Sequence, residues 1–346
     1  MRSTRTIARR GARAAAVTAA ALSLTLIAAA CSSSTPDPPD PPVDGAFVLS
    51  SAIQERVDAG EELSFAYVSN DTSIAYIEPQ KAGVAKAAEE LGVKAETLGS
   101  ATGSAEEQIS IIQTLITQGK IDGIAVAAVN VDSLKPVIEQ AFEAGIPLIS
   151  VFTDQPDSKQ LAYVGTDLEA AGKLEGDELV KALDGQAGTV VVVSIDAAAG
   201  WSSGRFTGFS GALAANPELK VVGPITTGAE PGQMFNTISN AMTANPDAVA
   251  IASMDCCSLT SAAKWVVDAG QEGAIKVVGH DALQSTINSI EDGVIQFGIS
   301  QDPVNLTYTA IKELNDFVRG GPLPETKPME FLLVTKDNAS DITPEG

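Results

Sequence analysis

Two aspartates directly follow apolar, strand-like segments, and this placement could bring a carboxylate to a small ligand. Asp255 comes after residues 248–253, and Asp281 comes after residues 275–279. An ionised carboxylate accepts hydrogen bonds from hydroxyl groups, and an arginine can balance its charge. For Asp281 an alternative role is the N-cap of a helix that begins near Leu283, where free N–H groups need an acceptor. The two roles are compatible, so we expect a polar site at the ends of these strands.

Four further side chains suit a hydroxylated ring: Arg205, Gln301, Trp201 and Phe152. A guanidinium is a planar fork of donors that can hold two neighbouring hydroxyls, and an amide both donates and accepts. An aromatic side chain can stack on the apolar face of the same ring. Each residue also has an ordinary structural interpretation. These are a surface salt bridge for Arg205, a hinge position for Gln301 and packing between lobe and loop for the two aromatic rings.

The chain has three cysteines, and two of them are neighbours: Cys31, Cys256 and Cys257. A disulfide between neighbouring residues closes a small ring that strains the peptide, so such bonds are uncommon. A vicinal disulfide between Cys256 and Cys257 would nevertheless persist outside the cytosol. The alternative is a pair of small buried thiols near a strand end. Both interpretations remain open from the sequence.

Motifs for catalysis are missing from the sequence. His280 is the sole histidine, which excludes a metal site built from several histidines. A single histidine at a strand end is more often structural than catalytic. We expect no nucleophile elbow, although residues 200–204 (Gly-Trp-Ser-Ser-Gly) match Gly-x-Ser-x-Gly in residue types, and the glycine loop at 99–103 lacks the Lys-Ser/Thr ending of a phosphate loop. We therefore expect a protein that is not an enzyme, with no cofactor and no metal.

Residues 1–30 are typical of a secretory signal peptide. They contain five arginines, no acidic residue and an apolar run at 14–30 that is too short for a permanent membrane span. Cys31 follows directly and resembles the cysteine of a bacterial lipobox, whose thiol takes a lipid. Residues 31–46 are rich in proline and serine, which predicts an extended tether. The sequence thus predicts a lipid-anchored protein on the extracytoplasmic face of the cell membrane.

The charge balance argues against nucleic acid as a partner. Without residues 1–30, which hold five of the 22 basic residues, the chain keeps 17 basic residues against 44 acidic ones, a net charge near −27. Binding to phosphates requires a basic surface, which this balance opposes. We interpret the charge as a contribution to solubility rather than as an acidic docking surface.

Strand-like and helix-like segments alternate along two stretches that flank a break at 153–159. The expected strands are 63–69, 93–98, 123–128 and 147–151 before the break, and 161–164, 189–195, 221–225, 248–253, 275–279, 295–299 and 331–335 after it. The expected helices are 77–91, 104–118 and 132–144 before the break, and 169–183, 203–216, 233–243, 259–269, 283–291 and 303–318 after it. A capping box from Ser104 to Glu107 and a cap at Asp132 mark two of the helix starts.

This alternation predicts the fold class. Apolar strands that take turns with helices indicate parallel sheets covered on both faces, an α/β architecture. Two such stretches indicate two similar lobes. Ligands bind this type of sheet in the crevice at the carboxyl ends of the strands.

Five segments together resemble the ribose-binding type of periplasmic sugar-binding protein, the solute receptors of ABC importers. They are 83–92, 163–172, 200–209, 277–281 and 299–303, and the resemblance covers roughly 65–334. It implies a type I periplasmic-binding fold, in which the chain crosses three times between two Rossmann-like lobes. We place these crossings near Asp154, Gln301 and Pro322. The first lobe is then 47–154 plus 302–322, and the second is 155–301 plus 323–346.

The resemblance also implies roles for single residues. Arg205, Asp281 and Gln301 match positions that contact the ligand in the family. Two departures concern the first lobe: residues 73–76 lack the family's Asn and Pro, and Phe152 with Thr153 stands where the family often has an aspartate. Asp154 could replace that aspartate, and Tyr76 and Asn70 are further candidates from the first-lobe loop. The expected ligand is therefore a sugar other than ribose, a polyol or another small polar solute.

The predicted function is capture of such a solute for the ABC permease of the inner membrane, by a protein that we expect to be a monomer. One alternative is a sensor that reports a ligand, such as an autoinducer-2-like furanose, to a chemoreceptor or kinase. A second alternative is an enzyme on the same scaffold, for which no nucleophile and base are found. A third is a sugar-responsive repressor, which the signal peptide and the charge oppose.

Overall fold

The computed structural model describes residues 46–342, 344 and 345, together with the side chains of all of these except Lys327. The predicted signal peptide, Cys31 and the tether up to residue 45 lie outside the described residues. The chain from Phe47 onward forms one unit. Within the described part, no helix combines the length and the apolar character that crossing a bilayer requires.

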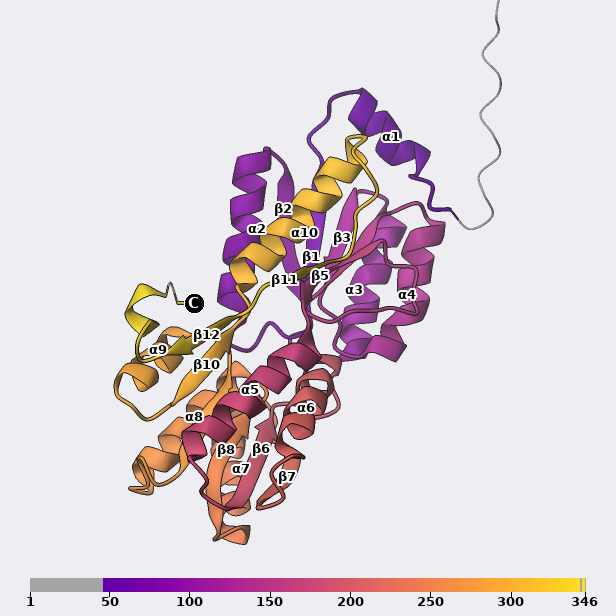
Figure 1. Cartoon of the computed structure of the whole chain (residues 1–346). Coiled ribbons are helices and arrows are strands. Elements are labelled where there is room, and N and C mark those ends of the chain that lie inside the picture. The colour runs from indigo at the N-terminus through magenta and orange to yellow at the C-terminus, as the bar shows by residue number, and fades with distance from the viewer. Residues whose placement is uncertain (1–45, 343, 346) are drawn as a thin grey trace, which may run out of the picture. The chain divides into compact units, whose positions relative to one another are not determined.

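Two six-stranded sheets organise this unit, and helices cover both faces of each sheet (Figure 1). The first sheet has the strand order β11-β5-β4-β3-β1-β2, and its pairings are parallel. Its strands are β1 (Ser64–Ser69), β2 (Lys94–Gly99), β3 (Gly123–Val126), β4 (Leu148–Val151), β5 (Ala162–Thr166) and β11 (Lys327–Met329). Strands β1, β3 and β4 are buried on both faces, which explains why they read as apolar runs.

The second sheet has the order β12-β10-β9-β8-β6-β7. Its strands are β6 (Gly188–Ser194), β7 (Leu219–Thr226), β8 (Ala248–Ser253), β9 (Lys276–His280), β10 (Phe297–Ser300) and β12 (Leu332–Thr335). Only β12 runs antiparallel to its neighbour, among the described strands of this sheet. The α/β prediction with two parallel-dominated lobes is therefore confirmed.

Helices on opposite faces enclose separate cores. The first sheet is covered by α2 (Ile77–Leu91), α3 (Ala105–Gln118), α4 (Val131–Glu143) and α10 (Pro303–Val318), and α1 (Ser51–Asp58) packs against α10. The second is covered by α5 (Leu168–Leu183), α6 (Gly200–Leu213), α7 (Pro231–Ala244), α8 (Cys256–Asp268) and α9 (Gln284–Glu291). In β6, Val190 and Val192 pack toward α5 and α6, whereas Val191 and Val193 pack toward α7 and α8. Alternate residues of a strand point to opposite faces, so one valine run serves both cores.

Helix starts agree only in part with the predicted caps. The Ser104 hydroxyl accepts from the N–H of Glu107, as in a capping box, at 3.4 Å. The Glu107 carboxylate does not return to Ser104, since it accepts from the Ser100 hydroxyl and the Ala101 N–H instead. The predicted cap at Asp132 is wrong, because the helix begins at Val131 and the Asn130 side chain accepts from the Ser133 N–H at 2.9 Å.

The crossings between the lobes differ from those that we predicted. Strand β5 pairs in parallel with β4, so residues 153–159 are a loop within the first lobe and the first crossing follows Thr166 rather than Asp154. Strand β11 also pairs with β5, so the third crossing lies between Met329 and Leu332 rather than near Pro322. The second crossing lies between Ser300 and Pro303, beside Gln301. Hydrogen bonds between distant strands decide these boundaries, and no local pattern encodes them.

Three elements were not predicted. The segment 48–60 contains helix α1, which begins after Ser50, whose side chain accepts from the Ile53 N–H. Strand β11 is three residues long and contains Pro328, so it has too few residues to show a strand pattern. A one-turn 3-10 helix, η1 (Ala339–Asp341), follows β12 and packs against α9.

Candidate ligand-binding site

A cavity with an empty volume of about 470 Å³, which includes space open to solvent, lies where the strand ends of the two lobes meet. Eight of the nine predicted site residues line it: Asn70, Tyr76, Phe152, Trp201, Arg205, Asp255, Asp281 and Gln301. Most of them follow the carboxyl end of a strand, as in Asn70 after β1, Phe152 after β4 and Asp281 after β9. The fold therefore brings together residues that are more than 200 positions apart in the chain.

Asp154 is the predicted site residue that this cavity does not include. Its carboxylate accepts from the Gln155 N–H at 2.7 Å and from the Gln160 side-chain amide at 2.5 Å. It lines a separate depression with Tyr163 and Asp167. The prediction that Asp154 replaces the family's aspartate is therefore corrected: this carboxylate orders its own loop.

Six residues of the cavity wall were not among the predicted site residues: Ile74, Gln80, Ala127, Ala128, Thr153 and Cys256. Ala127 and Ala128 follow the end of β3, so the strand-end rule that found Asp281 could have found them. Gln80 lies inside α2, and its Oε1 accepts from the hydroxyls of Tyr67 and Ser69. No sequence signal marks a residue of this kind.

Aromatic rings from both lobes contribute to the cavity wall. In the first lobe, Tyr76 and Phe152 pack edge to face, with ring centroids 6.0 Å apart and an angle of 64° between their planes. Phe152 has a φ of 63°, which is rare for a bulky residue and carries a conformational cost. In the second lobe, Trp201 and Arg205 are four positions apart on α6 and thus share one helix face.

Arg205 is buried, with 3% of its surface exposed, so a surface salt bridge is excluded. Its Nη1 donates to the backbone oxygen of Met254 at 2.6 Å, and its Cζ lies 5.8 Å from the Trp201 ring centroid. Its Nε has no hydrogen-bond partner among the described residues. A buried cation with a free donor is costly, so this guanidinium keeps an unused donor at the cavity wall.

Asp281 and Gln301 form a polar pair at the edge of the second lobe. The Gln301 Nε2 donates to Asp281 Oδ1 at 3.0 Å. Burial raises the pKa of Asp281, and the positive charge of Arg205 opposes that shift. The predicted capping role does not hold, because Leu283 is the N-cap residue of α9 and no side chain caps that helix. The Asp281 carboxylate is therefore turned toward the cavity and its neighbours there.

Asp255 lines the cavity, but backbone groups occupy its carboxylate. Its Oδ1 accepts from the N–H groups of Cys257 and Ser258 at 3.0 and 2.8 Å, and its Oδ2 accepts from Ile195 N–H at 2.8 Å. A carboxylate has about four acceptor positions, so little capacity remains for a ligand. Asp255 thus caps α8 and fixes the cavity wall.

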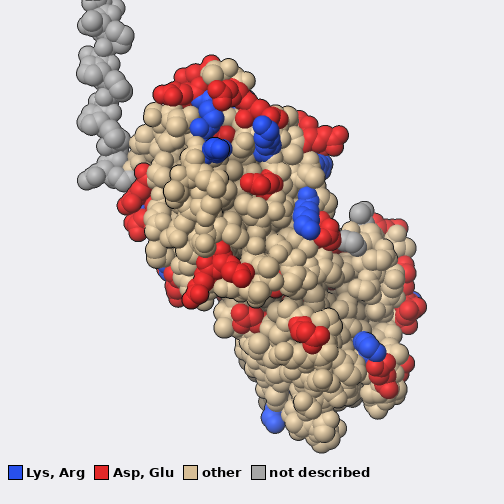
Figure 2. Space-filling view, turned by 180° about the vertical axis from the view of Figure 1, so that it is seen from behind, with Lys and Arg blue, Asp and Glu red and all other residues tan. Residues whose placement is uncertain are grey.

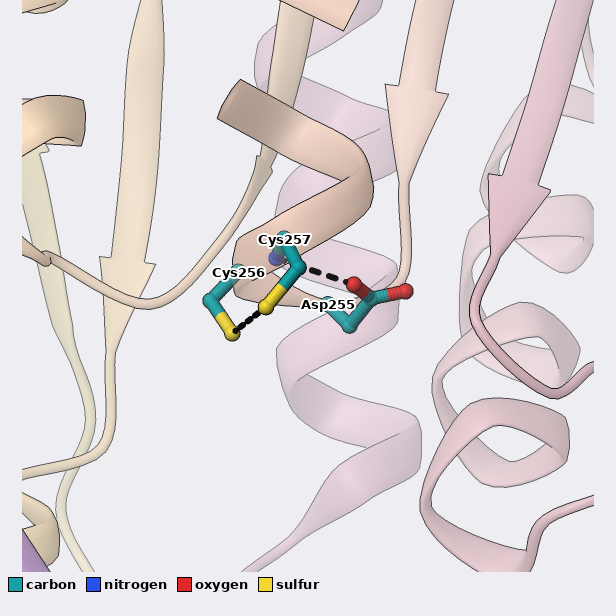
Figure 3. Close-up of side chains that lie close together, drawn as sticks. All are labelled: Asp255, Cys256 and Cys257. Atoms are coloured by element: carbon teal, nitrogen blue, oxygen red, sulfur yellow. Dashed lines mark hydrogen bonds between the residues drawn. The ribbon is translucent and has the colours of Figure 1, made fainter. Parts of the chain in front are cut away.

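The two neighbouring cysteines follow Asp255 at the start of α8 (Figure 3). Both are free thiols, and their Sγ atoms lie 3.1 Å apart, so the structure does not contain the vicinal disulfide that the sequence left open. The three side chains could also be considered as metal ligands. However, Asp255 is committed to backbone N–H groups, and the thiol hydrogen bond and burial raise the pKa of Cys256, which disfavours the thiolate that a metal needs.

His280 lies behind the cavity, next to a buried glutamate. Its Nε2 is 3.1 Å from Glu175 Oε2, and both residues are buried. Burial lowers the pKa of His280 and raises the pKa of Glu175, which favours the neutral form of each. His280 does not line the cavity. Its place supports the structural interpretation of this histidine.

On the face drawn in Figure 2, acidic groups are spread over both lobes and basic groups are few. This face therefore has no basic patch that would bind a polyanion. Several of the described lysines are paired with acidic neighbours, as Lys173 is with Asp177 and Lys264 is with Asp268. This surface agrees with the interpretation of charge as a contribution to solubility.

Comparison with known proteins identifies the class that this fold and site define. A family model described as periplasmic binding protein domain matches residues 65–322. The chain belongs to this family, and the resemblance to the ribose-binding type is confirmed.

Curated relatives and solved structures agree with this assignment. The chain is 24% identical over 270 residues to the D-allose-binding periplasmic protein of Escherichia coli, covering 74% of this chain and 86% of that protein. It is 26% identical over 241 residues to a xylitol-binding protein of Mycolicibacterium smegmatis, covering 69% and 68% of the two chains. An ABC transporter solute-binding protein of Burkholderia graminis, solved with D-arabinose, matches with a TM-score of 0.77 at 26% identity, covering 81% of this chain and 98% of that one.

Proposed function

We propose that this protein captures a sugar, a polyol or a similar hydroxylated solute outside the cytoplasm and delivers it to an ABC importer. One observation carries the proposal. Three buried polar atoms without a hydrogen-bond partner among the described residues belong to the cavity wall: Tyr76 Oη, Gln301 Oε1 and Arg205 Nε. They comprise a hydroxyl, an acceptor and a donor, which is the mixture that a polyhydroxylated ligand satisfies.

Burial of these three unpaired atoms favours the binding of a ligand that pairs with them. An unpaired buried polar group costs about 1–3 kcal/mol, so a ligand hydroxyl that pairs with one of these atoms recovers that cost on binding. The aromatic rings of Phe152 and Trp201 offer apolar surface for the C–H face of a sugar ring. Because the polar groups come from both lobes, a matching ligand joins the lobes and favours the closed form by a hinge motion.

We further propose that the protein binds its solute without chemical change and is held at the membrane through lipid on Cys31. The Cys256 thiol in the cavity wall is hydrogen-bonded to Cys257, and this contact and burial raise its pKa, which makes it a poor nucleophile. Product analysis after long incubation with a bound sugar checks the first statement. Replacement of Cys31 by alanine should move the protein from the membrane fraction to the soluble fraction, which checks the second.

The binding experiment is a thermal-shift and calorimetric screen of D-arabinose, D-allose, D-ribose, xylitol and autoinducer-2, with cyclohexanol as an apolar control. We expect at least one hydroxylated compound to bind with a Kd of roughly micromolar, about −8 kcal/mol. At a hundredfold excess over Kd that compound should stabilise the protein by about 2.7 kcal/mol. Equal responses to cyclohexanol and to every sugar and polyol would contradict the proposed function.

A further inference from the structure

A single carboxylate, that of Glu345, connects two segments that carry ligand-site residues. Glu345 is 4% exposed, although it follows η1 in a part of the chain with little regular structure. Its Oε2 accepts from the Ala282 N–H, and its own N–H donates to the Ala282 oxygen at 2.9 Å. Its Oε1 accepts from the Ser300 hydroxyl and from the N–H groups of Gln301 and Asp302, the latter two at 3.2 Å.

The backbone around Glu345 is shaped to receive an anion. Asp281, directly before Ala282, has a φ of 71°, and Asp302 has a φ of 53°. Residues in this left-handed region turn successive N–H groups toward one side, which creates a concave anion-binding nest. Neither residue is glycine, so this backbone conformation costs free energy at both positions. The surrounding structure must therefore hold the four donors around Glu345 in place.

The two bridged segments carry the polar pair of the ligand site. Asp281 precedes the Ala282 backbone group that Glu345 holds, and Gln301 is itself one of the bound N–H groups. The side chains of the same two residues pair with each other at 3.0 Å and line the cavity. Glu345 does not line the cavity. Its contacts also span the segment 300–302, where the chain crosses from the second lobe to α10.

We propose that Glu345 is a positioning residue, which clamps the loop after β9 to the crossing after β10 and so holds Asp281 and Gln301 in the geometry that binds the solute. This inference rests on the proposed function for its effect on affinity. The family match ends at residue 322, so Glu345 lies outside the matched residues.

The ionisation of Glu345 should make binding depend on pH, which simple packing of this side chain would not do. Burial and the neighbouring Asp281 raise the pKa of Glu345 to about 7, while the surrounding donors oppose the shift. Tyr76 is also close enough for the Glu345 charge to raise its pKa, and Arg205 acts on Tyr76 in the opposite sense. The ionised carboxylate accepts from all four donors, whereas the protonated form has less acceptor capacity. Desolvation and the Asp281 charge outweigh these donors, so ionisation of Glu345 costs free energy in the folded protein, and the clamp should weaken as the pH rises through about 7.

The first test measures affinity against pH for Glu345→Gln and Glu345→Ala, with Asp341→Asn as the matched control on exposed η1. The probes are D-arabinose, D-allose, D-ribose and xylitol, measured by calorimetry from pH 5.5 to pH 8.5. We expect Glu345→Ala to weaken binding at least tenfold, and Glu345→Gln to flatten the pH profile while it remains folded. Binding within twofold of wild type, with an unchanged profile in both variants, would overturn the proposal.

The second test does not need a ligand. Amide hydrogen exchange, measured by NMR, follows the N–H groups of Ala282, Gln301 and Asp302. We expect the protection of these three amides to fall at least tenfold in Glu345→Ala and to change with pH in wild type but not in Glu345→Gln. If no probe binds wild type, the proposed function fails while lost protection still supports the clamp. Unchanged protection refutes the clamp whether or not a sugar binds.

Discussion

Replacement of Arg205 by alanine is the sharpest test of the ligand site, because the guanidinium makes one hydrogen bond within the described part of the protein and its Nε donor is unused. Its Nη1 donates to the Met254 oxygen, and its Nε has no partner among the described residues. A hydrogen bond that involves a charged group contributes about 1.5–3 kcal/mol. Loss of two such bonds to ligand hydroxyls costs about 3 kcal/mol or more, which is about a hundredfold increase in Kd.

The fold should tolerate this change. Removal of the guanidinium leaves the Met254 oxygen without its donor, at a cost of about 1–3 kcal/mol, but it also removes a buried cation that no carboxylate of the described residues pairs with. These two effects oppose each other, so we expect a small net change in the free energy of unfolding. Arg205→Lys keeps the charge but loses the planar fork, and should fall between wild type and alanine.

Calorimetry with the tightest sugar or polyol from the screen gives the affinity, and urea unfolding gives the stability. Arg319→Ala is the matched control, since Arg319 is exposed and bonds to Asn315 on α10. A Kd for Arg205→Ala within threefold of wild type would refute the assignment of Arg205 to the site. Loss of cooperative unfolding would instead show that the side chain is structural.

Further predictions concern other parts of the site. Trp201→Ala should weaken sugar binding about tenfold by loss of ring contact, as calorimetry would show, and an unchanged Kd would remove this ring from the site. Asp154→Asn should leave affinity within twofold, because its carboxylate serves its own loop; a tenfold loss would restore it as a ligand residue. Thiol titration of the folded protein should label half-buried Cys257 faster than buried Cys256, and failure to find either thiol after unfolding would show that they are oxidised. Because the folded pKa of Glu345 is about 7 and the unfolded pKa is about 4.3, its stabilising effect is complete below pH ~4.3 and is lost as pH rises through 7. Urea unfolding should show the difference in the free energy of unfolding between wild type and Glu345→Gln shrink by up to ~4 kcal/mol over this range, and a constant difference would contradict the shift.

Local patterns in the sequence were sufficient for the class of fold and for most of the site. Apolar runs such as Val190–Val193 must be buried on both faces of a sheet. Because helices alternate with these runs, the arrangement that buries both faces is a parallel sheet covered by helices. Parallel strands end at the same edge, so polar residues placed just after a strand, such as Asp281 and Gln301, could be assigned to one site in advance. The spacing of Trp201 and Arg205 on one helix face is of the same local kind.

Only the tertiary structure decided which partners these side chains meet. Strand β5 joins the first sheet because its hydrogen bonds go to β4. The carboxylate of Asp255, which caps α8, is further occupied because it also accepts from the N–H of Ile195, 60 positions away. Glu345 has no sequence signal at all, since its four donors come from segments that lie more than 40 positions earlier. Local propensity sets what each segment can form, whereas long-range hydrogen bonds and burial determine which polar atoms are used by the protein and which remain for a ligand.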